Sequence, residues 1–195
     1  MTKMPKSFIT SDLHFNHQRI IEFCPESRGH CKTVDEMNHQ IIKNFNSVIS
    51  EEDTLYLLGD IGFGDVGSCI ELIRQLNGQK VWIHGNHDRK FWVSEQYYAN
   101  KESMRIIEDT PYKTIWYKVD GVKRFVVMFH FPIENWEQQS KGSIHLHGHL
   151  HSQNQRITQR RMDVGVDGNS LMPYDMDIVM RKLAKVPKPT DDYHG

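Results

Sequence analysis

The sequence has little that would stabilise it by cross-links or anchor it in a membrane. Among its 195 residues are three cysteines, Cys24, Cys31 and Cys69. So sparse and odd a set argues against a disulfide framework and for a reducing compartment. No apolar run is long enough to cross a bilayer, and the first ten residues lack the apolar core of a signal peptide. We therefore expect a cytoplasmic protein with no membrane partner.

The chain also lacks an excess of charge of either sign. Its 24 Lys and Arg residues nearly balance 25 Asp and Glu, which gives a formal charge of −1 at pH 7. Strong non-specific binding of nucleic acid normally requires a basic surface, so we do not expect it here. The length suits one substantial core. We predict a single domain over residues 1–195, with residues 186–195 as a tail rich in proline and charge.

Histidine is what the chain has in excess, with 12 residues. Histidine is the most common metal ligand and the side chain that titrates near neutral pH. Its abundance raises the odds of a metal site or of acid-base chemistry without proving either.

In the first half of the chain, three apolar runs that suit buried strands end in polar side chains. The runs are residues 7–11, 54–58 and 81–84. The polar residues that follow them are Asp12 with His14, Asp60, and Asn86 with His87. In sheets flanked by helices, ligands bind at the carboxyl ends of strands. If the chain stays extended past residue 11, Asp12 and His14 project to the same side and could hold one ion; alternatively, Asp12 caps a helix over residues 17–23.

The second half of the chain has the pattern of hairpins. Residues 112–119 and 122–129 are β-type runs joined by Asp120 and Gly121, a strong two-residue turn signal. His130 directly follows the second run. Residues 143–151 follow as another strand, which we expect Gly148 to break. That break would separate His149 and His151 from His145 and His147. For these two we favour a structural place or one behind the ligands over ligation itself.

Helical periodicity appears in three further segments. Thr33 and Glu36 form a plausible capping box for a helix, and two later segments carry apolar residues at helical spacing, the last beginning at Pro173. The expected inward-facing residues are Met37, Ile41, Phe45 and Val48; Ile70, Ile73 and Leu76; and Ile178, Met180 and Leu183. We expect a loop over residues 24–32 and closing strands over residues 156–161 and 162–166.

Five polar strand ends are difficult to explain as helix caps, and a shared metal site accounts for them better. Mixed carboxylate, imidazole and amide ligands suit Mn²⁺, Fe or Zn²⁺, with Ni²⁺ also possible. About seven candidate ligands are too many for one tetrahedral ion and enough for two. A zinc site of Cys24, His30 and Cys31 is a weaker alternative, because no second pair follows at the spacing of structural zinc sites.

The same residues resemble the motifs of a known family. In chain order the motifs are DLH at Asp12, GD at Gly59, GNHD at Gly85, the isolated His130 and GHLH at Gly148. Together they resemble the calcineurin-like metallophosphoesterases, over residues 7–184. The resemblance implies an α/β fold, a four-layer αββα sandwich of two mixed β-sheets flanked by helices.

The resemblance also implies roles for the motif residues. Asp12, His14 and His151 would hold one divalent metal ion, Asn86, His130 and His149 would hold the second, and Asp60 would bridge them. His87 would act beside the metals as general acid, and Asp88 would orient it. Mn²⁺ is the ion we expect most.

Some features depart from the family pattern or belong to a subgroup. Many relatives have GDxxD after the second strand, whereas GDIGFGD here places the next acid at Asp65, to which we assign no role. The extension HFNH, which ends at His17, and VGVD, which ends at Asp167, resemble small bacterial and phage phosphoesterases. We consider His17 and Asn86 candidates for substrate contact, although His17 could equally be an exposed residue of a helical turn.

These motifs predict a phosphoesterase that hydrolyses a small phosphate ester, possibly a nucleotide, by attack of a hydroxide that bridges the metals. A diester is favoured because no Arg or Lys lies within the metal motifs to neutralise a monoester dianion; Arg89 comes just after Asp88. A short chain also leaves little for a lid, so we expect an open groove. The alternatives are a non-catalytic module of the same fold, or a nuclease or phosphomonoesterase.

Overall fold

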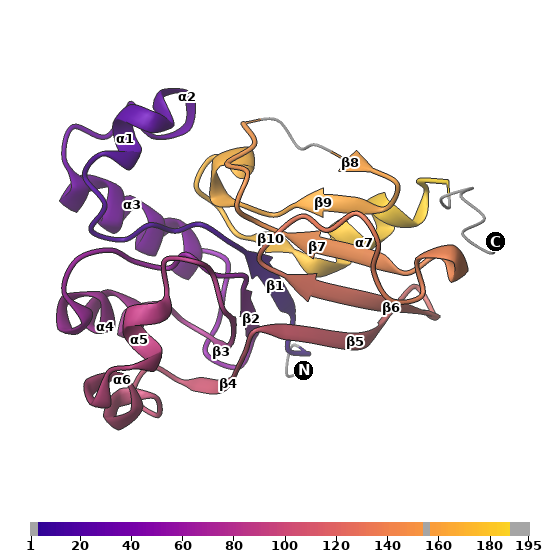
Figure 1. Ribbon diagram of the computed structural model, residues 1–195, viewed down its shortest axis with the longest axis horizontal. Coiled ribbons are helices and arrows are strands. Elements are labelled where there is room, and N and C mark those ends of the chain that lie inside the picture. Colours follow the sequence, from indigo (N-terminus) through magenta and orange to yellow (C-terminus); the bar gives the residue numbers. More distant parts are fainter. Residues whose placement is uncertain (1–3, 154–156, 188–195) are drawn as a thin grey trace.

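The computed structural model describes residues 4–153 and 157–187 and has two five-stranded sheets at its centre (Figure 1). The first sheet has the order β10 (Tyr174–Asp175), β1 (Ser7–Thr10), β2 (Thr54–Leu57), β3 (Gln79–Ile83) and β4 (Ile106–Thr110). The second has the order β5 (Tyr112–Val119), β6 (Val122–Phe129), β7 (Ile144–His147), β9 (Arg161–Asp163) and β8 (Ile157–Thr158). The predicted α/β sandwich is confirmed.

Both sheets are mixed. Strands β1 to β4 are parallel to one another, and β10 adds to β1 in the antiparallel direction. In the second sheet β6, β7 and β9 are parallel, while β5 and β8 pair antiparallel with β6 and β9. Within each sheet, the parallel strands therefore bring their carboxyl ends to one edge.

Most of the helices cover one face of the first sheet, on the side away from the second sheet (Figure 1). They are α1 (Ile20–Phe23), α2 (Pro25–Arg28), α3 (Val34–Asn46), α4 (Val66–Arg74), α5 (Arg89–Trp92) and α6 (Glu95–Asn100). Helix α7 (Met176–Ala184) instead packs against β1, β10 and β5. Two short 3₁₀ segments, η1 (Gln139–Lys141) and η2 (Val166–Asn169), lie in connections. No helix in the described ranges is both long and apolar enough to span a membrane.

The alternation of side chains along the strands divides the core into two parts. In β1, Phe8 faces the helices while its neighbour Ile9 faces the second sheet. In β3, Trp82 faces the helices, whereas Val81 and Ile83 pack into the space between the sheets. Successive strand residues point to opposite faces, so a strand buried on both faces is apolar at nearly every position. This explains why residues 81–83 of β3 form a continuous apolar run in the sequence.

Helix α3 begins where the capping pattern predicted. The hydroxyl of Thr33 accepts a hydrogen bond from the amide of Glu36 at 3.1 Å, but the Glu36 carboxylate accepts from the amide of Lys32 rather than that of Thr33. Met37, Ile41 and Phe45 are buried as expected. Val48 is 37% exposed, so its predicted inward position is wrong: the helix ends at Asn46 and the periodicity does not extend to Val48.

Other predictions about local structure also need correction. Residues 24–32 contain the short helix α2, because Pro25 is well suited to a first helical turn. The final helix begins at Met176 with Asp175 as its cap, and Ile178 is 63% exposed while Val179 is buried instead. Strand β4 was not predicted. The closing strands are only β8 and β9, and residues 154–156 and 188–195, including most of the expected tail, lie outside the described ranges.

Candidate metal centre

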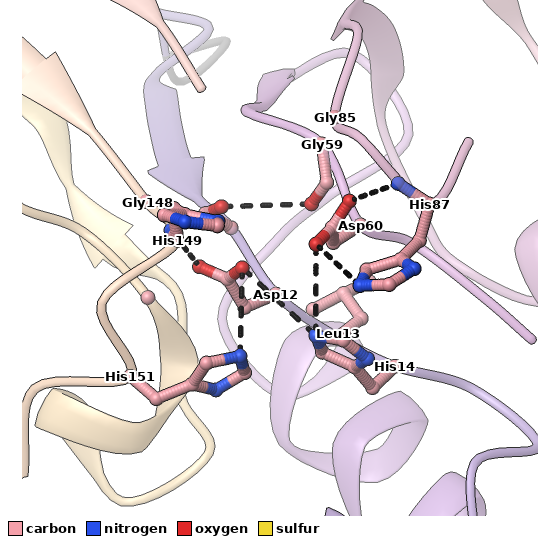
Figure 2. A network of polar contacts seen from close by, with 12 residues as sticks. Asp12, Leu13, His14, Gly59, Asp60, Gly85, His87, Gly148, His149 and His151 are labelled. Carbon is pink, nitrogen blue, oxygen red and sulfur yellow. Dashed lines mark hydrogen bonds and ion pairs between the residues drawn. The ribbon is translucent and has the colours of Figure 1, made fainter. Parts of the chain in front are cut away.

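The polar strand ends of both sheets meet at one place in the molecule (Figure 2). Asp12 and His14 follow β1, Asp60 follows β2, and His87 follows β3 in the first sheet. From the second sheet, His130 follows β6, and His149 and His151 follow β7. Segments more than a hundred residues apart in the chain thus contribute to one site, and the side chains gather into two clusters.

The first cluster consists of Asp12, His14 and His151. One ligand atom of each lies within 4.8 Å of the other two. Asp12 Oδ1 is 4.0 Å from Nε2 of His14 and 3.9 Å from Nε2 of His151. Asp12 Oδ1 and His14 Nε2 are both buried, and neither has a hydrogen-bond partner within the described part of the chain. Buried polar atoms without partners are costly, and a cation between these two would satisfy both.

The second cluster consists of Asp60, His130 and His149, whose ligand atoms also lie within 4.8 Å of one another. Nε2 of His130 is 3.4 Å from Asp60 Oδ2 and 3.0 Å from the side-chain oxygen of Asn86. The Asn86 amide oxygen is therefore placed beside this cluster, as the resemblance implied. Asn86 and His149 are exposed, so the cluster opens to solvent.

The Asp60 carboxylate lies between the two clusters. Its Oδ2 atom is 3.9 Å from His14 Nε2 on one side and 3.4 Å from His130 Nε2 on the other. Its Oδ1 atom accepts a hydrogen bond from the amide of His87 at 2.9 Å, which fixes the carboxylate plane. Of the described carboxylates, it alone contacts an imidazole from each cluster in this way. That is the geometry required of a bridging ligand.

The backbone at these strand ends is strained. Five of the candidate ligands have positive φ angles: Asp12, His14, Asp60, His149 and His151, at 59°, 52°, 54°, 72° and 48°. A non-glycine residue in this region costs about 1–2 kcal/mol, less for Asp. The expectation that Asp12 and His14 share a face because the chain is extended is therefore wrong. Both face the site because the chain turns sharply at each of them, and strain of this kind concentrates at functional sites.

Two glycines allow the strand ends to come this close. A Cβ atom on Gly148 would lie 1.9 Å from the Ser11 hydroxyl and 2.5 Å from Asp12 Oδ2. A Cβ atom on Gly85 would lie 2.2 Å from Asp60 Oδ1. Any side chain at either position would displace a candidate ligand. Steric crowding therefore explains why the GNHD and GHLH motifs begin with glycine.

A buried ion-pair network supports His151 from behind. Its Nδ1 donates to Asp167 Oδ2 at 2.8 Å, which leaves Nε2 to face Asp12. Asp167 in turn accepts two hydrogen bonds from Arg28, at 2.7 and 2.9 Å. Arg28 also donates to the carbonyl oxygens of Asp12 and Leu13. Outer partners of this kind fix the tautomer and orientation of a ligating imidazole.

The other two buried imidazoles are oriented in a similar manner. Nδ1 of His130 donates to the carbonyl oxygen of Leu58 at 2.7 Å, so Nε2 is free to face Asp60. Nδ1 of His14 lies 3.3 Å from Nδ1 of His17, and one ring donates to the other. His17 is thus held at the edge of the site against His14, and its ring also stacks on Phe63 with centroids 4.0 Å apart.

Asp88 does not have the role that the resemblance implied. Its Oδ2 atom accepts hydrogen bonds from the amides of Asp60 and Gly85 and from the indole of Trp82, at 2.8, 3.0 and 3.1 Å. Its Oδ1 atom accepts from the amide of Ile61 at 3.0 Å. Both oxygens are therefore committed to the core below the site, and no hydrogen bond in the described ranges joins Asp88 to the His87 ring. Asp88 instead holds the Asp60 and Gly85 backbones in place.

His87 lies at the open side of the site. Its side chain is 46% exposed, and its Nε2 atom is 3.9 Å from Asp60 Oδ2.

His145 and His147 lie elsewhere, buried in β7. Nδ1 of His145 is 3.3 Å from the Val127 carbonyl oxygen, and the amide of Ile133 donates to its Nε2. These two residues therefore have the structural place that we expected for them.

Burial and charge shift the pKa values of the candidate ligands in opposite directions. Burial raises the pKa of Asp12 to about 7, against the opposing effect of positive charge on His151 and His130. Burial alone would lower the pKa of His151, but its hydrogen bond to Asp167 and the charge of Asp12 raise it to about 10. Burial and positive charge on His151 lower the pKa of His14 well below its usual value. Without metal, the first cluster therefore holds a proton on His151 at neutral pH.

The donor set fits divalent cations. Each cluster offers carboxylate oxygen and imidazole nitrogen, which suit Mn²⁺, Fe and Zn²⁺, and the unpartnered atoms of Asp12 and His14 point to one position. Cys24, His151 and Asp167 form a third group of possible ligand atoms. There, however, Arg28 already pairs with Asp167, so a cation would compete with a buried guanidinium.

Sequence reasoning missed Arg28 altogether and gave Asp167 no role. Asp167 carried a signal, because it ends the VGVD segment shared with the subgroup. Arg28 carried no such signal, because it lies in a segment rich in turn formers. Only the fold shows that it is fully buried beneath Asp12.

Comparisons with known proteins find similar chains over most of the sequence. A relative from Methanocaldococcus jannaschii, the uncharacterized protein MJ1445, is 30% identical over 190 residues, covering 93% of each chain. The gene 66 protein of Mycobacterium phage L5 is 27% identical over 193 residues, covering 84% of this chain and 87% of its own. The crystal structure of a protein of unknown function, AQ665 from Aquifex aeolicus, shares the fold with a TM-score of 0.66 at 23% identity, covering 91% of this chain and 99% of that one.

The family comparison is the most direct. The model of the calcineurin-like phosphoesterases matches residues 6–153, which contain every candidate ligand. This chain belongs to the calcineurin-like phosphoesterase family.

Proposed function

We propose that this protein is a hydrolase that cleaves a phosphodiester of a small molecule or nucleotide with the help of two divalent metal ions, Mn²⁺ before Fe, Zn²⁺ or Ni²⁺. Family membership supports phosphoester hydrolysis in general. The observation that carries the dinuclear proposal is the position of Asp60 Oδ2, within 3.9 Å of an imidazole from each cluster. Asp12, His14 and His151 would hold one ion, and Asn86, His130 and His149 the other.

Two bound cations would supply positive charge that neutralises a phosphate ester and activates water. The remaining contributions come from the protein itself. Asp167, Leu58 and His17 hold the outer nitrogens of three imidazoles, so that the ligands are already oriented before anything binds. Such preorganisation removes the cost of arranging the site at the moment of reaction.

The proton for the departing alkoxide would come from His87. This residue lies beside Asp60 at the open edge, where its ring reaches both the site and solvent. A histidine side chain within reach of the leaving group can serve as a general acid. A p-nitrophenolate leaves without protonation and an alkoxide does not. His87→Ala should therefore lower kcat/KM for an alkyl ester by roughly 10²- to 10⁴-fold, and for a p-nitrophenyl ester much less. Equal losses would assign His87 to substrate or metal binding instead.

A diester is favoured over a monoester by the charges around the site. A monoester dianion carries a further negative charge that needs a cation beyond the metals. Arg28 is the cationic side chain that approaches the ligands from behind, but it is fully buried and committed to Asp167 and to two carbonyl oxygens. It cannot reach a substrate. The exposure of Asn86, His87 and His149 supports the open site that we expected, and the cations Arg19 and Lys90, exposed and half-buried respectively, lie farther out, against Phe23 and Phe63.

The test is hydrolysis of bis-p-nitrophenyl phosphate and p-nitrophenyl phosphate by the Mn²⁺-loaded protein under the same conditions. We expect a higher kcat/KM for the diester and no turnover after removal of metal by a chelator. A clear preference for the monoester would overturn the diester assignment. Tight binding of two ions without hydrolysis of either substrate would instead favour a non-catalytic module.

A further inference from the structure

A row of rings leads outward from the first metal cluster. The His14 ring lies 5.3 Å from that of His17, and His17 lies 6.1 Å from Phe23, measured between ring centroids. Phe63 stacks on His17 with an interplanar angle of 11° and also lies 4.7 Å from His87. Aromatic rings therefore line one flank of the site continuously, from a candidate ligand to the surface.

The end of this row is an exposed aromatic ring. Phe23 is 56% exposed, although its short helix α1 buries Ile20 in the core. A large apolar side chain that contributes little to the core, and that lies two ring contacts from a candidate metal ligand, has no evident role in stability. A contiguous exposed apolar patch typically marks an interaction site, and Phe23 continues into the partly buried rings of His17 and Phe63.

Cationic side chains accompany the rings. The guanidinium carbon of Arg19 is 4.8 Å from the centroid of Phe23, and Nζ of Lys90 is 5.8 Å from the centroid of Phe63. Both belong to the partly or fully exposed residues of the structure, unlike the buried Arg28. Aromatic faces combined with cations are the features that bind bases joined to a phosphate backbone. A purely apolar partner would gain nothing from the cations.

We propose that Phe23, His17 and Phe63 form a stacking platform for the base of a nucleoside phosphodiester, with Arg19 and Lys90 beside it. This inference rests on the proposed phosphodiesterase function and specifies its substrate class. Ring separations of 5.3 and 6.1 Å lead from His14 through His17 to Phe23, so the exposed end of the row lies close to the first metal cluster. Because every base has an aromatic face, the platform selects nucleosides as a class and discriminates weakly among bases.

The experiment compares two diesters with the same leaving group, the p-nitrophenyl ester of thymidine 5′-monophosphate and methyl p-nitrophenyl phosphate, with the Mn²⁺-loaded protein. The ratio of their kcat/KM values reports the contribution of the nucleoside alone. We expect the wild-type ratio to exceed about ten, and Phe23→Ala to lower it by about tenfold, as loss of one stacking contact predicts. Phe23→Trp should preserve the ratio, because the larger ring still stacks.

A matched control is Trp116→Ala, which removes another exposed aromatic side chain, 60% exposed on β5 in the second sheet. It should leave both kcat/KM values at the wild-type level. A second readout is the Kd for thymidine 5′-monophosphate, measured by calorimetry, which should be about tenfold weaker in Phe23→Ala than in wild type.

The two proposals fail in different ways. A wild-type ratio near one, or a ratio that survives Phe23→Ala, would overturn the platform while the diesterase function stands. If neither ester is hydrolysed, the proposed function fails, and the thymidine 5′-monophosphate titration decides the platform by itself. In that titration, equal affinities of wild type and Phe23→Ala would overturn it.

Discussion

The two clusters of candidate ligands are built from the same residue types but differ in their surroundings. Asp12 and His14 are buried, the His151 side chain is 24% exposed, and Arg28 and Asp167 form a second layer behind them. In the second cluster Asp60 and His130 are buried, while His149 and the neighbouring Asn86 are exposed. The first site is thus the more enclosed before any ion arrives, and the second is completed by exposed side chains.

This difference predicts unequal affinities. A ligand set already held by packing loses less conformational entropy on binding than one with mobile members. The first cluster should therefore bind its ion more tightly, and the second should load later and exchange faster. The second cluster is also the one nearer solvent, where a substrate can enter.

The largest expected effect comes from the residue that the clusters share. Asp60→Asn should weaken both ions at once and lower kcat/KM roughly a thousandfold, because a bridge contributes to two sites worth several kcal/mol together. Metal content after reconstitution with Mn²⁺ would fall well below two equivalents. If this variant retains both ions with wild-type affinity, Asp60 is not a bridge.

Removing one imidazole from each cluster tests the inequality directly. His149→Ala should keep one tightly bound equivalent of Mn²⁺, since the enclosed cluster is untouched. His14→Ala should lose that tight equivalent and retain a weaker one. Calorimetric titration of the two variants gives the comparison. Equal remaining affinities would show that enclosure does not decide the strength of binding.

A smaller effect should follow from loosening the layer behind the first cluster. Asp167→Asn removes the charge that orients His151 and pairs with Arg28, and outer partners of metal ligands are typically worth 10- to 100-fold in affinity. Only the tight ion should be weakened. Because a buried ion pair is broken, the melting temperature must be measured as well. Asp175→Asn, which alters the cap of α7 instead, is the matched control and should not affect metal affinity.

The pH dependence of binding should also separate the clusters. Burial opposes protonation of His130, but its bond to Asp60 and nearby carboxylates raise its pKa to about 9; the pKa of His151 is raised to about 10 and that of Asp12 to about 7. A metal ligand must be deprotonated, so groups with raised pKa values release protons on binding, and affinity rises with pH until it passes those values.

Between pH 6 and 7, the second cluster releases a proton from His130, and affinity should rise about tenfold per pH unit. The first cluster releases one from His151 and part of another from Asp12, so its dependence should be steeper. His14→Ala and His149→Ala isolate the second and first clusters for this measurement. A steeper slope for the second cluster would contradict the assignment of the raised pKa values.

Much of this site was visible in the sequence because its members follow strands directly. An apolar run that stops at a glycine or a polar residue marks a strand end, and Asp12, Asp60, Asn86, His130 and His149 could each be found that way. The hairpin turn at Asp120 and Gly121 was found equally well, since two-residue turns have strict residue requirements. Helix boundaries were less accurate, as Val48 and Ile178 show, because periodicity continues past the point where a helix stops making contacts.

The sequence by itself determined the strand ends and the residue types available as ligands, because periodicity, turn chemistry and motif spacing are local properties. The sandwich followed from the resemblance of these motifs to a known family. Only the tertiary structure decided that Asp88 supports the Asp60 backbone rather than His87, that Arg28 lies buried against Asp167, and that Phe23 continues a row of rings from His14. Each of these depends on packing between groups that are not neighbours in the chain: Phe23 is 9 residues from His14, Asp88 is 28 from Asp60, and Arg28 is 139 from Asp167. Hydrogen bonds and ring contacts act over a few ångströms, and only the folded chain defines which groups lie that close.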